Sequence, residues 1–465
     1  MLDRYDRQNM IPGWNQNLLR EAKVAVIGSG YLSAQVLLGL AGLGAGDIMV
    51  VDNGRKTGMQ PPMQFFTGPD GNSNSEHLEG LIRRINPDIH VTGLHWKFYY
   101  LTDTAVLSDR TLIIDATNDP ASKYHTLTFA KSRGIPAIVA AANEVQADVQ
   151  VCSSGEHDES LVQRAFAEAL QGILPSGVAA GFVLDRARKY LLPLPDDQDF
   201  TTPLNYDLLS TDRFPQELAQ KGVLPQCDFA SKTVLIVGAG SLGNIVSIQM
   251  AMLGMGRVYI ADYDLVESVN LNRQLLLYER LGEPKAAVLT ERLAEINPGA
   301  TYIPVEQRIE LSFAEYLNKH KPDIVLDCVD NFRTRATLDY FAKRLGIPLV
   351  SGGTDFKSGQ VVTYVPGQTA CLECQLDISK YAEAELAREA EHCTAVPEPS
   401  VIISNQIIGN LMAAEAFATL AKWPGLRPVQ GSIKYDSNSA QSIGAVGLIG
   451  PCECHLKSEG DVLVR

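Results

Sequence analysis

The sequence predicts an α/β fold in which one domain occurs twice along the chain. Two segments, beginning at residues 23 and 233, each contain a short apolar strand, a glycine-rich turn and an apolar helix. In each segment the next strand ends in an aspartate, Asp52 in the first and Asp262 in the second. Strands that alternate with helices in this way form a parallel sheet with helices packed on its faces.

The similarity between the two segments continues along the chain and identifies an internal repeat. The matching stretches are 23–33 (KVAVIGSGYLS) and 233–243 (TVLIVGAGSLG), 111–115 (TLIID) and 323–327 (DIVLD), and 134–136 (GIP) and 346–348 (GIP). We therefore expect two tandem Rossmann-like domains. Their predicted bounds are 1–192 for the first copy, 193–227 for a polar, proline-rich linker with a lead-in helix, and 228–465 for the second copy.

Composition and charge exclude several classes of protein. The chain has 465 residues, which is enough for two or three domains. Its formal net charge of -14 argues against a general nucleic-acid-binding protein, which would carry a basic face. No apolar run reaches the roughly 18 residues that a membrane span requires, and the N-terminus lacks the apolar region of a signal peptide. We expect a cytoplasmic protein that binds neither nucleic acid nor membrane.

The glycine-rich turn of the second copy has the pattern of a nucleotide-binding site. Gly238, Gly240 and Gly243 follow the spacing G-x-G-x-x-G between a strand and a helix, and Asp262 follows the turn at about 20 residues. Taken alone, this pattern favours an NAD-dependent oxidoreductase. The residues that follow change this interpretation.

Charged residues beyond the turn favour a triphosphate over a dinucleotide. Asn270 and Arg273 lie in the stretch NLNRQ, Lys285 follows it, and Asp330 and Asn331 come after a predicted strand. Arginine binds phosphate oxygens in a bidentate fork, and lysine supplies a point charge. A carboxylate is the oxygen ligand that Mg²⁺ prefers. A dehydrogenase has no need of this set, whereas ATP with Mg²⁺ does.

The two copies are not equivalent. In the first copy Ser33 replaces the third glycine, which normally allows the helix and strand to pack closely at the phosphate turn. Asn118 stands where the second copy has Asp330, and nothing in the first copy matches NLNRQ. We expect one degenerate site and one active site.

Together these residues resemble the superfamily of ubiquitin-activating E1 enzymes and their bacterial relatives that adenylate sulfur-carrier proteins. The resemblance covers nearly all of the second copy and is looser over the first. It implies a pseudo-dimer of two adenylation domains that uses ATP and Mg²⁺ to adenylate the C-terminal glycine of a ubiquitin-like protein. It also implies the nucleotide ligands: Gly238, Gly240 and Gly243 at the turn, Asp262 on the ribose, Asn270, Arg273 and Lys285 on the phosphates, Asp330 on Mg²⁺, and Asn331 in the same site.

The N-terminus resembles the family motif whose arginine reaches across the two-fold axis into the partner site. It reads Arg4-Tyr-Asp-Arg7-Gln8, and Arg7 matches that arginine. If Arg213 corresponds to Arg4, then Gln216 replaces Arg7 before the second copy. Arg7 would then act within one chain and, with Arg273, Lys285 and Mg²⁺, would stabilise charge on the α- and β-phosphates. The alternative is an N-terminal helix with surface arginines.

Four of the eight cysteines form two close pairs, Cys371 with Cys374 and Cys452 with Cys454. Four thiolates in two pairs suit a tetrahedral structural Zn²⁺ site. The C-x-C spacing of the second pair departs from the commoner family spacing, so His455 is an alternative ligand. The competing interpretation is four unlinked buried cysteines.

Cys393 lies between two predicted helices, where the compact E1 enzymes of this superfamily have the cysteine that accepts the acyl group. The match implies a thioester on Cys393, formed when its thiolate attacks the acyl-adenylate, and onward transfer to an E2-like protein. The alternative is an ordinary loop cysteine. Two helices predicted at 158–171 and 178–192 pack on the first copy or offer a partner surface.

The sequence leaves four functions to compare. The first is an E1-type enzyme, and the two-copy plan resembles the E1-like proteins of bacterial conjugation operons linked to antiviral defence. The second is a sulfur-carrier-protein adenylyltransferase without an obligatory thioester. An oxidoreductase is disfavoured by Arg273, Lys285 and Asp330. A pseudoenzyme scaffold would have lost the ATP ligands in both copies, and the second copy retains them.

Overall fold

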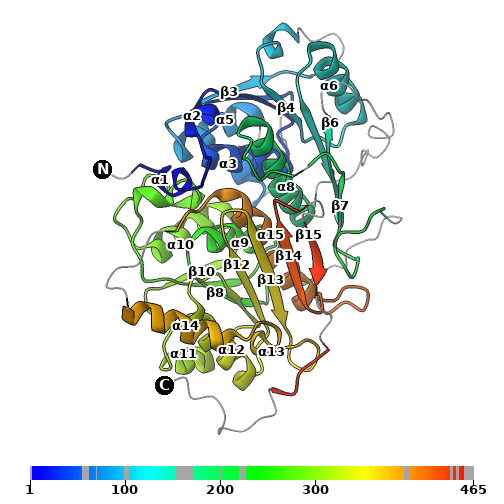
Figure 1. Ribbon diagram of the computed structural model, residues 1–465. Coiled ribbons are helices and arrows are strands. Elements are labelled where there is room, and N and C mark those ends of the chain that lie inside the picture. Colours follow the sequence, from blue (N-terminus) through cyan, green and yellow to red (C-terminus); the bar gives the residue numbers. More distant parts are fainter. Residues whose placement is uncertain are drawn as a thin grey trace.

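The structure confirms two tandem α/β domains, each built on one mixed sheet (Figure 1). It is a computed structural model and describes residues 3–54, 62–69, 71–98, 104–152, 172–198, 200–218, 227–391, 398–439, 443–446 and 450–454. No helix in these ranges is long and apolar enough to cross a lipid bilayer.

The first sheet has seven strands in the order β3-β2-β1-β4-β5-β6-β7. The first five are parallel, and β6 and β7 extend the sheet in antiparallel fashion. The strands are β1 Lys23–Ile27, β2 Asp47–Asp52, β3 His90–His95, β4 Leu112–Asp115, β5 Ala137–Ala142, β6 Gln146–Cys152 and β7 Leu204–Asp207. Strand β7 therefore comes from the segment that the sequence assigned to the linker.

The second sheet repeats this order and adds one strand, as β10-β9-β8-β11-β12-β13-β14-β15. Its strands are β8 Thr233–Val237, β9 Arg257–Ala261, β10 Thr301–Val305, β11 Ile324–Asp327, β12 Leu349–Thr354, β13 Ser358–Tyr364, β14 Ser432–Asp436 and β15 Ile443–Val446. Strands β10 to β12 are parallel with β8 and β9, and the last three are antiparallel.

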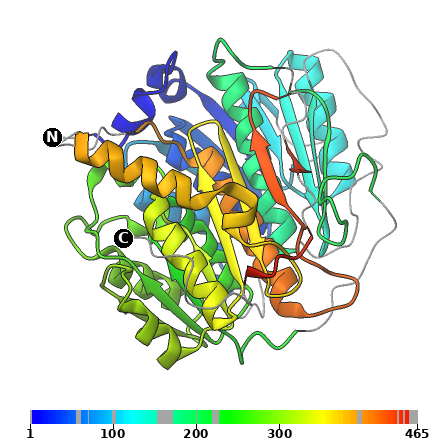
Figure 2. The same ribbon diagram turned by 60° about the horizontal axis from the view of Figure 1, so that its bottom comes forward.

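Helices cover both faces of each sheet. Those of the first copy are α1 Asp6–Asn9, α2 Gln16–Arg20, α3 Tyr31–Leu43, α4 Gln64–Thr67, α5 Asn74–Ile85, the 3₁₀ turn η1 Thr104–Leu107, α6 Pro120–Arg133 and α8 Ile173–Leu191. Those of the second are α9 Ser241–Met252, η2 Ser268–Asn270, η3 Leu275–Leu277, α10 Lys285–Ile296, α11 Phe313–His320, α12 Phe332–Leu345, α13 Leu372–Leu376, α14 Ile378–Glu391 and α15 Ile402–Ala421. Helix α14 packs along α12 on the outer side of the second copy (Figure 2).

Equivalent helices of the two copies begin and end with the same chemistry. The side chain of Asp119 caps α6 through the N–H of Ala121, and Asn331 caps α12 through the N–H of Thr334. Gly134 and Gly346 end these helices in the left-handed conformation, which glycine adopts without strain. The repeat seen in the sequence thus extends to the local signals that set the helix ends.

One apolar core runs through both copies. It joins the inner faces of the two sheets through α3, α8, α9 and α15, and smaller cores fill the outer face of each sheet. In Figure 1 the first copy, in blue and cyan, lies above the second, with α8 and α15 packed together between the sheets. The copies therefore form a pseudo-dimer whose seam is made of helices.

Helix α8 includes all but the last residue of the predicted helix 178–192, and the favoured interpretation that this helix packs on the first copy is confirmed, whereas the alternative of a partner surface is wrong. It is buried along almost its whole length, because it packs on α3 and also on α15 of the second copy. Gly177 and Gly181 allow this close approach, since a Cβ at either position would overlap Asn410 or Ile407. The other predicted helix, 158–171, lies outside the described residues.

Candidate functional site

The glycine-rich turn of the second copy lies between β8 and α9 and ends against β9. Gly238 has a φ of +98°, a conformation that favours glycine. The backbone N–H of Ala239 donates to the Asp262 carboxylate at 2.6 Å, which fixes the turn to the end of β9. A Cβ on Gly243 would overlap the carbonyl oxygen of Gly238, whereas a Cβ on Gly240 would meet only Gln274, at 3.9 Å. There is therefore no room for a side chain at Gly243, whereas there is free space next to Gly240.

We expect Gly243→Ala to destabilise the fold by about 2 kcal/mol or more, because the added methyl group meets backbone that cannot move away. Gly240→Ala is expected to change stability by less than about 1 kcal/mol, since its methyl group finds open space. Thermal unfolding of the two variants measures this contrast. Equal melting temperatures for both variants would contradict the geometry.

Arg273 is a buried cation of the site, with 9% of its surface exposed. Its Nη1 donates to the carbonyl of Val269 at 2.7 Å and to Oδ1 of Asn272 at 2.9 Å, both neutral acceptors. Burial, and to a smaller extent the charge of Arg7, lower its pKa to about 10, while the charge of Asp330 opposes this shift. Arg273 remains a cation at neutral pH, next to a second arginine.

Arg7 comes from α1, in the first copy, and lies close enough to the second copy to affect Arg273. Its Nη1 donates to the carbonyl of Glu398 at 3.2 Å, and its own carbonyl accepts the N–H of Ser400 at 3.2 Å. Among the residues that the structure describes, neither Arg7 nor Arg273 forms an ion pair. Two neighbouring cations without a carboxylate partner are what an anion site requires.

Three other expected phosphate or ribose ligands lie around the same turn. Lys285, the first residue of α10, forms an ion pair with Asp264 at 3.0 Å. Asn270 accepts the N–H of Glu267 at 3.0 Å and is buried. Burial raises the pKa of Asp262, while the N–H groups of Asp264 and Ala239 oppose this shift. All three residues follow β9, at the carboxyl edge of the parallel strands: Asp262 directly, Asn270 as the last residue of η2, and Lys285 beyond η2.

Asp330 and Asn331 differ in their roles. Asp330 is exposed, and its negative charge acts on Arg273. Asn331 accepts the N–H of Thr334 at 2.8 Å and is the N-cap of α12. Asn331 therefore has a structural partner, whereas the Asp330 carboxylate is accessible to a cation.

The corresponding turn of the first copy carries larger side chains than the turn of the second copy. The Ser29 hydroxyl bonds to Asp52, where the second copy uses the backbone of Ala239. Tyr31 is fully buried and packs edge-on against Phe66, with ring centroids 5.3 Å apart. Asn118, the counterpart of Asp330, bonds in both directions to the backbone of Ala142.

The four cysteines of the predicted zinc site lie together. The sulfur atoms of Cys371, Cys374, Cys452 and Cys454 are all within 4.8 Å of one another. The sulfurs of Cys374 and Cys454 are 3.3 Å apart, and that of Cys452 accepts the N–H of Cys371 at 3.2 Å. Four sulfurs bound to one Zn²⁺ at about 2.3 Å would lie roughly 3.8 Å apart, so the cluster fits such an ion. His455 lies outside the described residues.

Cys393 lies outside the described residues. Arg213 and Arg4 have different partners, because Arg213 bonds to Glu415 of α15 at 2.9 Å while Arg4 donates to the carbonyl of Ile85 at 3.1 Å. The correspondence of Arg213 with Arg4, and of Gln216 with Arg7, stays a prediction.

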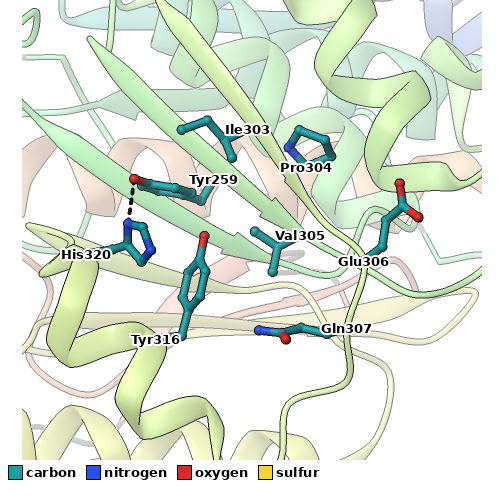
Figure 3. Close-up of a pocket in the computed structure, with 8 residues that line it drawn as sticks. All are labelled: Tyr259, Ile303, Pro304, Val305, Glu306, Gln307, Tyr316 and His320. Atoms are coloured by element: carbon teal, nitrogen blue, oxygen red, sulfur yellow. Dashed lines mark hydrogen bonds between the residues drawn. The ribbon is translucent and has the colours of Figure 1, made fainter.

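An open hollow of about 350 Å³ lies elsewhere, against the edge strand β10 and helix α11 (Figure 3). The hydroxyl of Tyr259 and the ring of His320 are hydrogen-bonded there at 2.8 Å. Burial lowers the pKa of His320, which disfavours a positive charge on its ring, and Glu306 adds a negative charge. The hollow contains none of the expected nucleotide ligands and does not favour phosphate.

The sequence did not assign roles to several residues that the structure brings into the site. Arg308 lies over the ring of Tyr263, 4.4 Å from its centroid, directly after Asp262. Gln8 belongs to the N-terminal motif Arg4-Tyr-Asp-Arg7-Gln8, and Asn272 belongs to the NLNRQ stretch. These two side chains are hydrogen-bonded to each other, but they lie too far apart along the chain for spacing to predict the contact. Lys285 forms its ion pair with Asp264. In the sequence, the two carboxylates of Asp262-Tyr-Asp264 were the feature from which this pair could have been predicted.

A family model describes both copies. The model of the ThiF family matches residues 5–190 and 210–448. The chain belongs to the ThiF family. Within this family, the molybdopterin-synthase adenylyltransferase of Escherichia coli is 33% identical over 213 residues, which cover 45% of this chain and 80% of that protein. The SAMP-activating enzyme E1 of Haloferax volcanii is 34% identical over 178 residues, 37% of this chain and 64% of that protein.

Other ThiF-family relatives are longer than the matched region. Ubiquitin-like modifier-activating enzyme 5 of Oryza sativa is 28% identical over 197 residues, 39% of this chain and 47% of that protein. The counterpart of Dictyostelium discoideum is also 28% identical, with 51% of its length covered. The chain thus spans about half the length of these two relatives.

Proposed function

We propose that the second copy adenylates the C-terminal carboxylate of a ubiquitin-like protein, with ATP as the other substrate. The observation that carries this proposal is the pair of neighbouring cations, Arg7 and Arg273, beside an open glycine-rich turn. The names of the relatives support it, since they are called modifier-activating enzymes and adenylyltransferases. The first copy supplies Arg7, and its own turn carries larger side chains, since Ser29 bonds to Asp52 and Tyr31 is buried there.

The chemistry follows from charge. The carboxylate attacks the α-phosphorus, the bond to the bridging oxygen breaks, and pyrophosphate leaves with that electron pair. Negative charge grows on the phosphate oxygens, and Arg7, Arg273 and Lys285 stabilise it there. Asp330 is the residue that would hold Mg²⁺, which neutralises phosphate charge when bound. No covalent catalyst is required for this half-reaction.

We also propose that Cys393 then takes the acyl group. Its thiolate attacks the carbonyl carbon of the acyl-adenylate, AMP leaves, and a thioester forms. An E2-like protein is the acceptor in this scheme. The alternative is a sulfur-carrier-protein adenylyltransferase that passes the adenylate to a sulfur donor without this thioester, and the E. coli relative named above supports that alternative. A part in antiviral defence rests on the resemblance of the two-copy plan alone.

The experiment is a gel run without reducing agent after incubation with Mg-ATP and a ubiquitin-like protein that ends in glycine. A band shifted in mass, sensitive to dithiothreitol and absent in Cys393→Ala, supports the E1-type reaction. Release of pyrophosphate without such a band supports the sulfur-carrier alternative. If neither is seen with any of a panel of such proteins, the adenylation proposal is wrong.

We propose that Zn²⁺ occupies the cluster of Cys371, Cys374, Cys452 and Cys454 and ties the C-terminal segment to α13. Cys371→Ser is expected to lose the metal and to lower the melting temperature by several degrees, because the ion links segments about 80 residues apart. Metal analysis by mass spectrometry measures the content. The control is Cys227→Ser, outside the cluster, which should retain one zinc per chain. Wild-type protein purified without chelators and free of zinc would contradict the assignment.

A further inference from the structure

Several buried polar groups take no part in the adenylation chemistry. Two of them, Gln8 of the first copy and Asn272 of the second, are fully buried and meet at the seam between the copies. The Nδ2 of Asn272 donates to Oε1 of Gln8 at 3.0 Å. A buried amide pair that joins two domains must have every polar atom satisfied, or it would cost stability.

Both amides continue into a longer chain of hydrogen bonds. At one end, Oδ1 of Asn272 accepts Nη1 of Arg273 at 2.9 Å. At the other end, Nε2 of Gln8 donates to the carbonyl of Leu43 at 3.1 Å and to Oε1 of Gln16 at 2.5 Å. Each link uses the donor of one side chain and the acceptor of the next. The direction of every amide in the chain is thereby fixed.

The far end of this chain of hydrogen bonds lies at the C-terminus of helix α3, where the partial charge favours hydrogen-bond donors. Leu43 is the last residue of α3, where the carbonyl groups of a helix carry partial negative charge. A chain of donors that starts at a buried guanidinium and ends at such carbonyls polarises along its length and favours the cation. Groups of the first copy thus stabilise the positive charge of Arg273, which belongs to the second copy.

The backbone segments of the two copies are also closely packed where Gln8 and Asn272 meet. A Cβ on Gly42 would lie 2.6 Å from the carbonyl oxygen of Asn272, so α3 and the NLNRQ segment are in close contact. Gln8 is also the direct neighbour of Arg7 on the four-residue helix α1. Fixing Gln8 in the seam therefore fixes where Arg7 emerges beside Arg273.

We propose that Gln8 and Asn272 are positioning residues that hold Arg7 and Arg273 together across the seam, so that the phosphate site of the second copy is complete only with the first copy in place. This inference rests on the proposed function, because it concerns the same site. It assigns the degenerate copy a role beyond the donation of one arginine.

The test is calorimetric titration of the full chain with Mg-ATP and, separately, with adenosine, which lacks phosphates. Gln8→Met and Asn272→Leu keep side-chain volume and remove the amide. Each is expected to weaken Mg-ATP binding about tenfold, since a hydrogen bond to a charged group is lost, and to leave adenosine binding unchanged. In an Arg273→Ala background, Asn272→Leu should have no further effect on Mg-ATP binding.

A matched control separates positioning from general loosening of the seam. Gln249 is also fully buried there and donates to Asn410 at 2.6 Å, but it lies outside the chain to Arg273. Gln249→Met should lower the melting temperature without weakening Mg-ATP binding. If Gln8→Met does not fold, Gln8→Asn, which is too short to reach both partners, replaces it.

The outcomes of these titrations distinguish the positioning role of Gln8 and Asn272 from the proposed adenylation function. Wild-type protein that binds no Mg-ATP would contradict the proposed function. Wild-type protein that binds Mg-ATP, with Gln8→Met and Asn272→Leu binding equally well, would overturn the positioning role and leave the function standing. Equal losses in Gln249→Met, or additive losses in the Arg273→Ala background, would also overturn it.

Discussion

Arg273→Ala is expected to lower the rate of ATP–pyrophosphate exchange about a hundredfold or more, with little change in stability. Arg273 is a buried cation beside a second cation, and the charge that grows on the phosphates in the transition state would offset their repulsion. Removal of one such preorganised charge typically costs two to three orders of magnitude, by analogy with the loss of an oxyanion donor. The measurement uses the ubiquitin-like protein that supports exchange in the wild type.

The matched control for this variant is Arg280→Ala. Arg280 lies on the same segment but forms partly exposed ion pairs with Glu283 and Glu291. Its loss should leave exchange within about twofold of the wild-type rate. An Arg273→Ala enzyme as active as Arg280→Ala would show that the buried guanidinium has no part in phosphate binding.

Arg213→Ala is expected to lower the free energy of unfolding by about 3 kcal/mol or more. Its guanidinium and the Glu415 carboxylate are each 1% exposed, and they pair at 2.9 Å between the segment after β7 and α15. The same guanidinium donates to three carbonyl groups, those of Leu208, Ser210 and Arg427. Its removal leaves a buried carboxylate without its cation, which is strongly destabilising.

Lys232 and Asp323 offer a comparison on the surface. They pair at 3.1 Å with about a third of each side chain exposed, so Lys232→Ala should cost about 1 kcal/mol or less. Calorimetric melting of both variants tests the difference. A loss in Arg213→Ala no greater than that in Lys232→Ala would contradict the description of the buried pair.

The sequence predicted the parts of this fold that local patterns determine. The strands before Gly28 and Gly238 and the repeat itself follow from periodicity and turn chemistry over short distances. Asn331 was predicted as a nucleotide ligand, and its role as the cap of α12 was not. The clustering of Arg273 with Lys285 and Asp330 could also be expected, because the carboxyl ends of parallel strands meet at one edge of a sheet.

Features that depend on contacts between the copies could not be predicted in this way. Helix α8 contains the polar residues Asp185, Arg188 and Lys189, whose partners the sequence does not indicate. In the structure they are buried, because Asp185 pairs with Lys189 at 3.2 Å and accepts the hydroxyl of Ser437, which follows β14 of the second copy, at 2.6 Å. The partner of Arg213 could not be predicted for a similar reason, since Glu415 lies 202 residues away.

The central claim is that one copy binds ATP and the other does not. Calorimetric titration of the wild-type chain with Mg-ATP tests it most directly. We predict one site per chain, which is lost in Asp330→Ala together with Arg273→Ala and retained in Asp52→Ala of the first copy. Two sites per chain, or loss of binding in Asp52→Ala alone, would contradict the account.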